Sequence, residues 1–97
     1  MSTTHAIGRR KTSIARVYLK KGKGKVLVNN RDLSNYFATA MLQYKVNQPF
    51  ALTDTLGKYD VKVSVVGGGV TGQAEAIRLG ISRALLILNP DFRATLK

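Results

Sequence analysis

The sequence contains no cysteine and a single histidine, His5. Without cysteine there is no disulfide framework and no thiolate metal site, and the chain fits a reducing, cytoplasmic type of compartment. A nucleophilic Ser–His pair would have to use His5, which we expect in a mobile terminus. We therefore predict no catalytic residue, no metal site and no cofactor.

Long apolar runs are also absent. No segment approaches the roughly 20 apolar residues of a membrane-spanning helix, and the start lacks the apolar core of a signal peptide, so we expect no membrane partner. The 97 residues, 44% of them hydrophobic, are enough for one core and too few for two. We therefore predict one globular domain over residues 1–97, without repeats, linkers or low-complexity tracts.

Acidic residues are scarce, with 5 Asp and Glu against 16 Lys and Arg, for a net charge of +11. Such a field on a small domain favours a polyanionic partner, most commonly nucleic acid. The basic residues before the first acid, Asp32, are Arg9, Arg10, Lys11, Arg16, Lys20, Lys21, Lys23 and Lys25. A solvated basic face is the alternative. Because no acid is interleaved to neutralise this segment, nucleic-acid contact is favoured.

Alternating residues over 13–20 predict a half-buried strand with a basic outward edge. A lysine- and glycine-rich turn follows over 20–25, and residues 26–28 form a second strand, so the segment indicates a hairpin with lysines at its tip. Tyr18 lies on the outward face between two basic residues. It either stacks on a base or ribose or packs along the neighbouring strand.

Short helices are expected in the middle of the chain. Residues 29–32 offer caps for a helix that extends through Phe37, and a second helix spans about 39–46 with Met41, Leu42 and Val46 turned inward. Gln48-Pro49 should end that helix, because a residue before proline is pushed out of the helical region. Residues 50–52 then favour another strand.

The second half of the chain has the strongest patterns. Residues 59–65 alternate as a strand with a valine-rich face, glycines follow over 67–72, and then comes the longest helix. Asn89 and Pro90 end that helix and begin a short terminal one. We expect the strand face to be buried against the helix stripe, which comprises Ala74, Ile77, Ile81, Ala84, Leu85 and Leu88.

Gly67, Gly69 and Gly72 match the spacing G-x-G-x-x-G between a strand and a helix. A dinucleotide-binding enzyme would need a second parallel strand ending in an acid, but Asp91 follows a proline near the chain end. A kinase would need clustered acids for Mg²⁺, and Glu75 stands alone and favours the helix start instead. The alternative is that the glycines only form a tight turn between the strand and the helix and bind no ligand. We favour a nucleic-acid phosphate at the helix start, with Gln73 and Arg78 nearby.

Three stretches together resemble the family of the ninth small-subunit ribosomal protein. They are residues 8–17 (GRRKTSIARV), 28–37 (VNNRDLSNYF) and 59–78 (YDVKVSVVGGGVTGQAEAIR), of which the last is the most specific. Gln48-Pro49-Phe50 and Asn89-Pro90 fall where the family also has a Gln-Pro and a polar helix break. The likeness covers essentially the whole chain in order.

The resemblance implies a single α+β domain: a four-stranded sheet with helices on one face and a left-handed β-α-β crossover, like the second domain of ribosomal protein S five. It implies no enzyme activity. It implies binding to ribosomal RNA in the small-subunit head through the first strand, the hairpin and the glycine loop, beside neighbouring ribosomal proteins. The expected RNA-binding residues are Arg9, Arg10, Lys11, Thr12, Arg16, Tyr18, Lys20, Lys21, Lys23, Lys25, Gly67, Gly68, Gly69, Thr71, Gly72, Gln73 and Arg78.

One departure from the family concerns the end of the sequence. The family continues into a long basic tail that contacts P-site transfer RNA, whereas this sequence stops at Thr95-Leu96-Lys97. Truncation, omission and natural loss all remain open, so the transfer-RNA role falls on no residue here. A bacterial origin is favoured over an organellar one. A free-standing nucleic-acid module outside the ribosome is the main alternative, and a phosphate-handling enzyme ranks third because acids and bases do not cluster.

Overall fold

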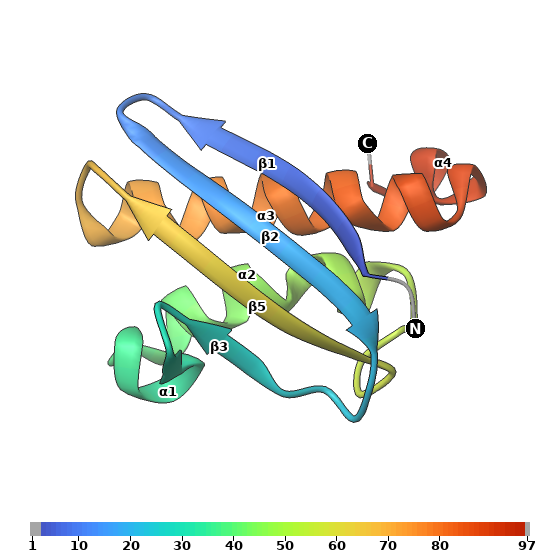
Figure 1. Ribbon diagram of the computed structural model, residues 1–97, viewed down its shortest axis with the longest axis horizontal. Coiled ribbons are helices and arrows are strands. Elements are labelled where there is room, and N and C mark those ends of the chain that lie inside the picture. Colours follow the sequence, from blue (N-terminus) through green and yellow to red (C-terminus); the bar gives the residue numbers. More distant parts are fainter. Residues whose placement is uncertain (1–2, 97) are drawn as a thin grey trace.

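Residues 3–96, as described by the computed structural model, form one mixed sheet with helices on one of its faces (Figure 1). The strands run in the spatial order β1-β2-β5-β3-β4. They are β1 (Thr4–Arg10), β2 (Ser13–Lys21), β3 (Val26–Val28), β4 (Arg31–Asp32) and β5 (Tyr59–Val66). The helices are α1 (Leu33–Tyr36), α2 (Ala40–Leu52), α3 (Val70–Leu88), the 3-10 turn η1 (Pro90–Phe92) and α4 (Arg93–Leu96). The α+β class is confirmed.

The prediction of four strands was wrong, because the described residues form a 5-stranded sheet. β1 was missed where the sequence showed no strong pattern. Its inward positions carry Ala6 and Gly8, both buried but too small to give a clear hydrophobic alternation. β4 is only 2 residues long and pairs with β3. The left-handed crossover stays a prediction.

The predicted hairpin of β2 with β3 was also wrong, because β5 lies between these two strands. β2 is antiparallel to β5 from Ile14↔Val66 to Lys21↔Tyr59, whereas β3 runs parallel to β5. Strand length explains this choice. β2 has 9 residues and β5 has 8, so they share a long ladder with valines buried on one face, and β3 offers only 3 residues to either partner.

Helix α2 continues through Pro49 to Leu52, so the predicted helix end and the strand over 50–52 were both wrong. Val46, Pro49 and Phe50 are its buried residues. Their spacing places them on one helical face, and burying Phe50 there outweighs the hydrogen bond that proline cannot donate. Met41, expected inward, is 78% exposed.

Helix α3 buries most of its predicted stripe. Ala74, Ile77, Ile81, Ala84 and Leu85 are fully buried, whereas Leu88 is 43% exposed. The β5 valines Val61, Val63 and Val65 lie in the same core, as expected. The helix itself lies mainly across β1 and β2, beside α2 (Figure 1).

Two glycines let α3 approach the sheet closely. A Cβ on Gly80 would lie 2.6 Å from Val17 Cγ2 and 3.2 Å from the Gly8 backbone nitrogen. A Cβ on Gly8 would overlap the carbonyl oxygen of Ala76 and the backbone nitrogen of Gly80. The pair therefore fixes how closely β1 and α3 pack.

The chain beyond α3 turns as the sequence indicated. Asn89 is the N-cap of η1, its Oδ1 accepts a hydrogen bond from the Asp91 backbone N–H at 3.0 Å, and Pro90 is the first residue of the turn. None of the helices within residues 3–96 has the length and apolar character that a bilayer crossing requires.

Candidate nucleic-acid interface

The turn between β1 and β2 lies against the glycine loop that precedes α3. We call residues 9–13 and 67–72 together the turn–loop pole. Its surface holds a hollow of about 230 Å³. The residues around it are Arg10, Lys11, Thr12, Ser13, Gly68, Gly69, Thr71, Gly72 and Glu75. The fold thus brings together basic and glycine segments that the sequence keeps far apart.

The glycine loop is fixed to the turn by backbone geometry. Gly67 and Gly68 have φ of 83° and 64°, in the left-handed region that favours glycine. A Cβ on Gly67 would overlap the Thr12 carbonyl oxygen, and one on Gly68 would overlap Ser13 Oγ. Ser13 is buried, and its hydroxyl donates to the Gly67 carbonyl at 3.0 Å. The loop conformation therefore depends on the turn beneath it.

Gly69 is the N-cap of the 19-residue helix α3, and a Cβ added there would meet nothing within 4 Å. The first N–H groups of a helix have no partner within it, and the aligned peptide dipoles make this end positive. The hollow thus combines backbone N–H donors, two threonine hydroxyls and basic side chains. This donor set suits a phosphate.

Gln73 holds the loop in place from the helix side. Its Nε2 donates to the Gly67 carbonyl at 3.1 Å, and its Oε1 accepts from the Tyr36 hydroxyl at 2.7 Å. Asn29 extends the support, since its amide exchanges two hydrogen bonds with the backbone of Val65, at 2.9 and 3.0 Å. Sequence reasoning missed Tyr36 and Asn29 because their partners lie about 36 residues away.

Arg78 does not join the hollow. Its Nη1 donates to Gln48 Oε1 of α2 at 3.3 Å, and its Nε is buried without a hydrogen-bond partner in the described residues. The expectation that Arg78 lies near the glycine loop was therefore wrong. The helix turns this side chain toward α2 instead.

Glu75 lies among the basic side chains near the turn–loop pole, although no acid interrupts the basic residues in the sequence before Asp32. Its carboxylate is 3.3 Å from Lys45 Nζ and 2.7 Å from Arg10 Nε. Hydrogen bonds from Lys45 and then from Arg10 lower the pKa of Glu75. Glu75 lies beyond the first turn of α3, so it orients Arg10 rather than acting at the helix start.

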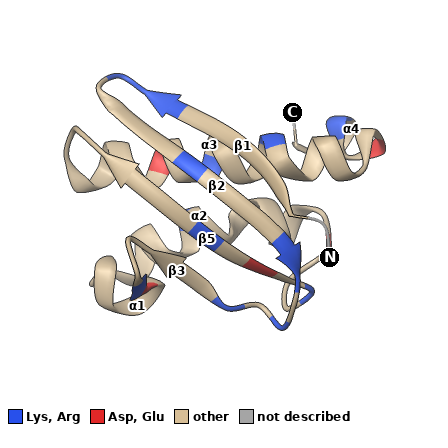
Figure 2. Cartoon of the chain, viewed as in Figure 1, with Lys and Arg blue, Asp and Glu red and all other residues tan. Residues whose placement is uncertain are grey.

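The other four lysines that were expected to bind RNA lie at the opposite end of β2, around the 22–25 segment (Figure 2). Asp60 organises this segment, because its Oδ1 accepts from the backbone N–H groups of Lys23, Gly24 and Lys25 at 3.0, 3.2 and 3.0 Å. These bonds, led by those from Lys25 and Lys23, lower the pKa of Asp60. Lys20, Lys21, Lys23 and Lys25 are all exposed. Asp60 is the acid of β5, and it pairs with Lys20 across the two strands.

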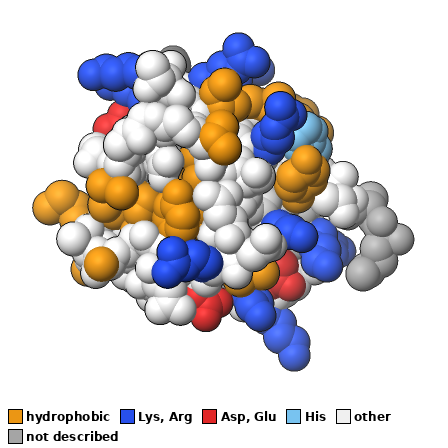
Figure 3. Space-filling model, turned by 60° about the vertical axis from the view of Figure 1, so that its left-hand side comes forward, with side chains coloured by type: hydrophobic (Ala, Val, Ile, Leu, Met, Phe, Trp, Pro, Cys, Tyr) orange, Lys and Arg blue, Asp and Glu red, His pale blue; other side chains and the backbone are white. Residues whose placement is uncertain are grey.

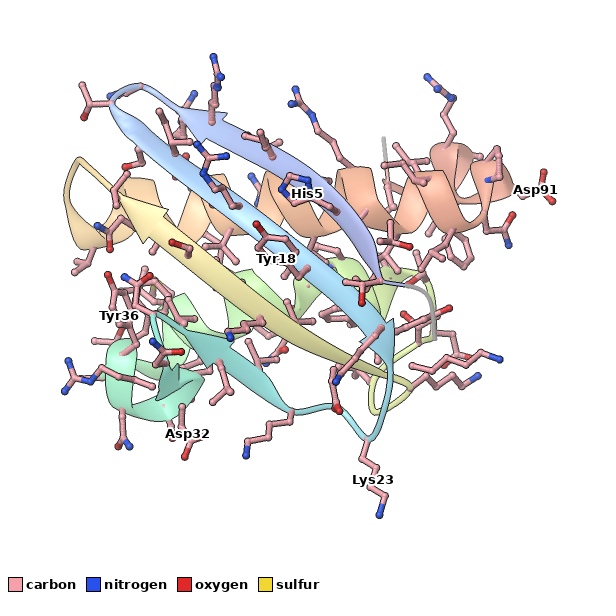
Figure 4. The ribbon with its side chains drawn as sticks, viewed as in Figure 1. His5, Tyr18, Lys23, Asp32, Tyr36 and Asp91 are labelled. Atoms are coloured by element: carbon pink, nitrogen blue, oxygen red, sulfur yellow. The ribbon has the colours of Figure 1, made fainter. Side chains whose placement is uncertain are left out.

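Tyr18 and His5 lie side by side on the sheet face away from the helices (Figure 4). Their rings are stacked with centroids 4.6 Å apart and planes 18° apart. Packing along the neighbouring strand, one of the two alternatives for Tyr18, is thus present. Tyr18 still keeps 38% of its surface exposed. His5 belongs to β1, so placing it in a mobile terminus was wrong.

A family model described as ribosomal protein S9/S16 matches residues 8–97. The chain belongs to this family. Small ribosomal subunit protein uS9 of Christiangramia forsetii is 56% identical over 97 residues, which is 100% of this chain and 76% of that protein. For uS9 of Cytophaga hutchinsonii the identity is 57%, and for that of Porphyromonas gingivalis 48%, over the same shares.

S9/S16 is a family of ribosomal structural proteins and not of enzymes. The glycine loop also lacks the surroundings of a dinucleotide-binding motif within the described residues. After the glycine loop, α3 leads into η1 and α4 with no second parallel strand in the described chain, and Asp91 lies in η1. Within residues 3–96, no three His, Asp or Glu side chains come together where a metal ion would be held.

Proposed function

We propose that this S9/S16 chain is a structural constituent of the small ribosomal subunit and binds ribosomal RNA of the subunit head. The turn–loop pole is the main contact. The observation that carries this is one hollow in which Arg10, Lys11 and the N-terminus of α3 converge. Three phosphate-binding features meet there, whereas each of them alone is common in proteins.

Phosphate recognition divides among the residues of the pole. Arg9 and Lys11 are exposed and neutralise the backbone from outside. Gly69, Thr71 and Gly72 present backbone N–H groups and a hydroxyl within the hollow. Gln73 acts as a positioning residue because both ends of its amide are engaged. Arg78 is not part of the proposed interface.

A second contact lies at the other end of β2. Asp60 holds the backbone of the 22–25 segment, so the exposed lysines project from a fixed loop. Arg16, exposed midway along β2, links the two ends. RNA bound at both ends would therefore span the sheet. We propose neighbouring proteins of the head as further partners and assign no residue to them or to P-site transfer RNA.

Salt dependence of RNA binding tests the two contacts separately. Each lost phosphate contact should flatten the slope of log K against log salt by about 0.7–0.9. We expect Arg9→Ala with Lys11→Ala to lower the slope of binding to a head-domain RNA by about 1.5. Replacing Lys20, Lys21, Lys23 and Lys25 together with Ala should lower the slope by more than the double variant does. It should also weaken binding to every RNA sequence.

The control is Arg31→Ala with Arg93→Ala, which removes the same charge from exposed positions outside both contacts. It should leave the slope unchanged. Equal slopes for the Arg9/Lys11 variant and wild type would contradict the pole as a phosphate site. Equal losses in the control would mean that only net charge matters.

A further inference from the structure

The sheet face opposite the helices carries side chains aligned across four strands. His5 pairs with Tyr18, Tyr18 with Lys62, and Lys62 with Leu27, so one row crosses β1, β2, β5 and β3. No helix of the described chain covers this face (Figure 1). We call it the open face. Figure 3 shows His5 bordered there by hydrophobic and basic side chains.

Two hollows flank the centre of the open face. One, of about 410 Å³, includes Lys20, Lys25 and Leu27 in its walls. The other, of about 330 Å³, includes Asn30 and Ser64. Tyr18 and Lys62 border both hollows. With its ring stacked on His5, Tyr18 offers a supported aromatic surface between two spaces large enough for ligand groups.

Charge on the open face favours an anionic partner. Arg9, Arg16, Lys20 and Lys62 lie on its strands and are exposed. The acids on the same strands are Asp60, whose Oδ1 is engaged by three backbone N–H groups, and Asp32 on the edge strand β4. Basic side chains thus outnumber carboxylates around the aromatic centre, and Asp60, which also borders the larger hollow, already accepts these three hydrogen bonds.

We propose that the open face binds an unpaired RNA nucleotide, with its base stacked on Tyr18 and its phosphates near Arg16 and Lys62. This inference rests on the proposed RNA-binding function and adds a second mode to it. Sheets with exposed aromatics bind splayed-out bases by stacking, whereas paired bases are hidden inside a duplex. Asn30 and Ser64 supply polar groups for the base edge. The turn–loop pole, by contrast, binds phosphates of both single-stranded and duplex RNA.

The test compares a ten-nucleotide single-stranded RNA of mixed sequence with its duplex. Stacking on an aromatic ring contributes about 1–3 kcal/mol per base, so Tyr18→Ala should weaken single-strand binding by about 5- to 150-fold. Duplex binding should change less than twofold. Tyr18→Phe keeps the ring and should bind both RNAs like wild type. Tyr18→Leu keeps the apolar bulk but lacks the aromatic ring, so it controls for any loosening of the sheet by alanine. It should weaken single-strand binding as much as Tyr18→Ala does.

Tyr44→Ala is the matched control, because Tyr44 is 65% exposed on α2, in the helical layer. It should leave both affinities unchanged. The proposal would be overturned if the Tyr18→Leu variant bound single strands like wild type, or if it lost equal affinity for both RNAs.

Gly69→Asp distinguishes binding at the open face from binding at the turn–loop pole. If it weakens both RNAs while Tyr18→Leu weakens neither, the pole stands and the open face fails. If Tyr18→Leu alone weakens single-strand binding, the open face stands and the pole fails.

Discussion

Gly8→Ala probes the closest contact between the two layers. The added methyl group would overlap the Ala76 carbonyl oxygen and the Gly80 backbone nitrogen, both on the buried side of α3. Backbone gives way less readily than a side chain, so we expect the upper part of the usual overpacking range, about 3 kcal/mol. Alanine also lowers the conformational entropy of the unfolded chain, which stabilises the folded state by roughly 0.4–1 kcal/mol. The net loss in the free energy of unfolding should be about 2 kcal/mol or more.

Two other glycines calibrate this value. In Gly80→Ala the methyl group meets Val17 Cγ2 at 2.6 Å and the Gly8 backbone nitrogen only at 3.2 Å, and the helix gains about 0.8–1 kcal/mol from alanine's propensity. In Gly69→Ser the new Cβ enters open space, and serine is a good N-cap. The destabilisation should therefore decrease in the order Gly8→Ala, Gly80→Ala, Gly69→Ser, with the last within about 0.5 kcal/mol of wild type.

Thermal and urea unfolding followed by circular dichroism measure the series. A loss of 2 kcal/mol in a domain of this size lowers Tm by about 8–16 °C. The urea m-value should stay constant, since the fold is kept. A Tm for Gly8→Ala within 2 °C or so of Gly69→Ser would refute the close packing of β1 on α3.

Three further outcomes are expected. Ile81→Ala should destabilise the fold by about 2–5 kcal/mol in urea unfolding, because Ile81 is fully buried, and a loss below about 0.5 kcal/mol would place that helix face in solvent. The pKa of Asp60 is lower in the folded state, so the stability it contributes is present above its unfolded pKa and is lost as the pH falls through the folded one. Asp60→Asn should flatten that acid limb of a stability–pH profile, and an unchanged limb would mean that the 22–25 segment needs no carboxylate. Calorimetric titration with NAD or ATP should show no binding, and a micromolar titration would overturn the assignment of the glycine loop.

The elements that the sequence predicted well are those whose pattern is set by burial of their own residues. The β2 and β5 alternation and the α3 stripe each bury one face, and that period is visible locally. Leu88 is the exception in α3, because the helix extends past the end of the core. The glycine segment was predicted because a strand, a glycine run and a helix follow one another directly.

The elements that failed depend on partners far along the chain. β1 has small inward residues because α3 comes close, and only the fold shows why Gly8 suits a strand. β3 was predicted to pair with β2 in a hairpin, but in the sheet β5 lies between these two strands. The basic and glycine residues of the proposed interface were identified from the sequence. The acids Glu75 and Asp60, which orient them, were missed because their partners lie 65 and about 36 residues away.

Association with small ribosomal subunits lacking this protein tests the central claim most directly. Gly69→Asp adds a carboxylate in open space beside the N-terminus of α3, where it would repel a phosphate, and Gly69→Asn adds a side chain of nearly the same shape without the charge. Both variants should melt like wild type. We predict that wild type and Gly69→Asn sediment with the subunits in moderate salt and that Gly69→Asp largely does not. Equal sedimentation of folded Gly69→Asp and Gly69→Asn would contradict phosphate binding at the turn–loop pole, and failure of the folded wild-type chain to sediment would contradict the ribosomal role itself.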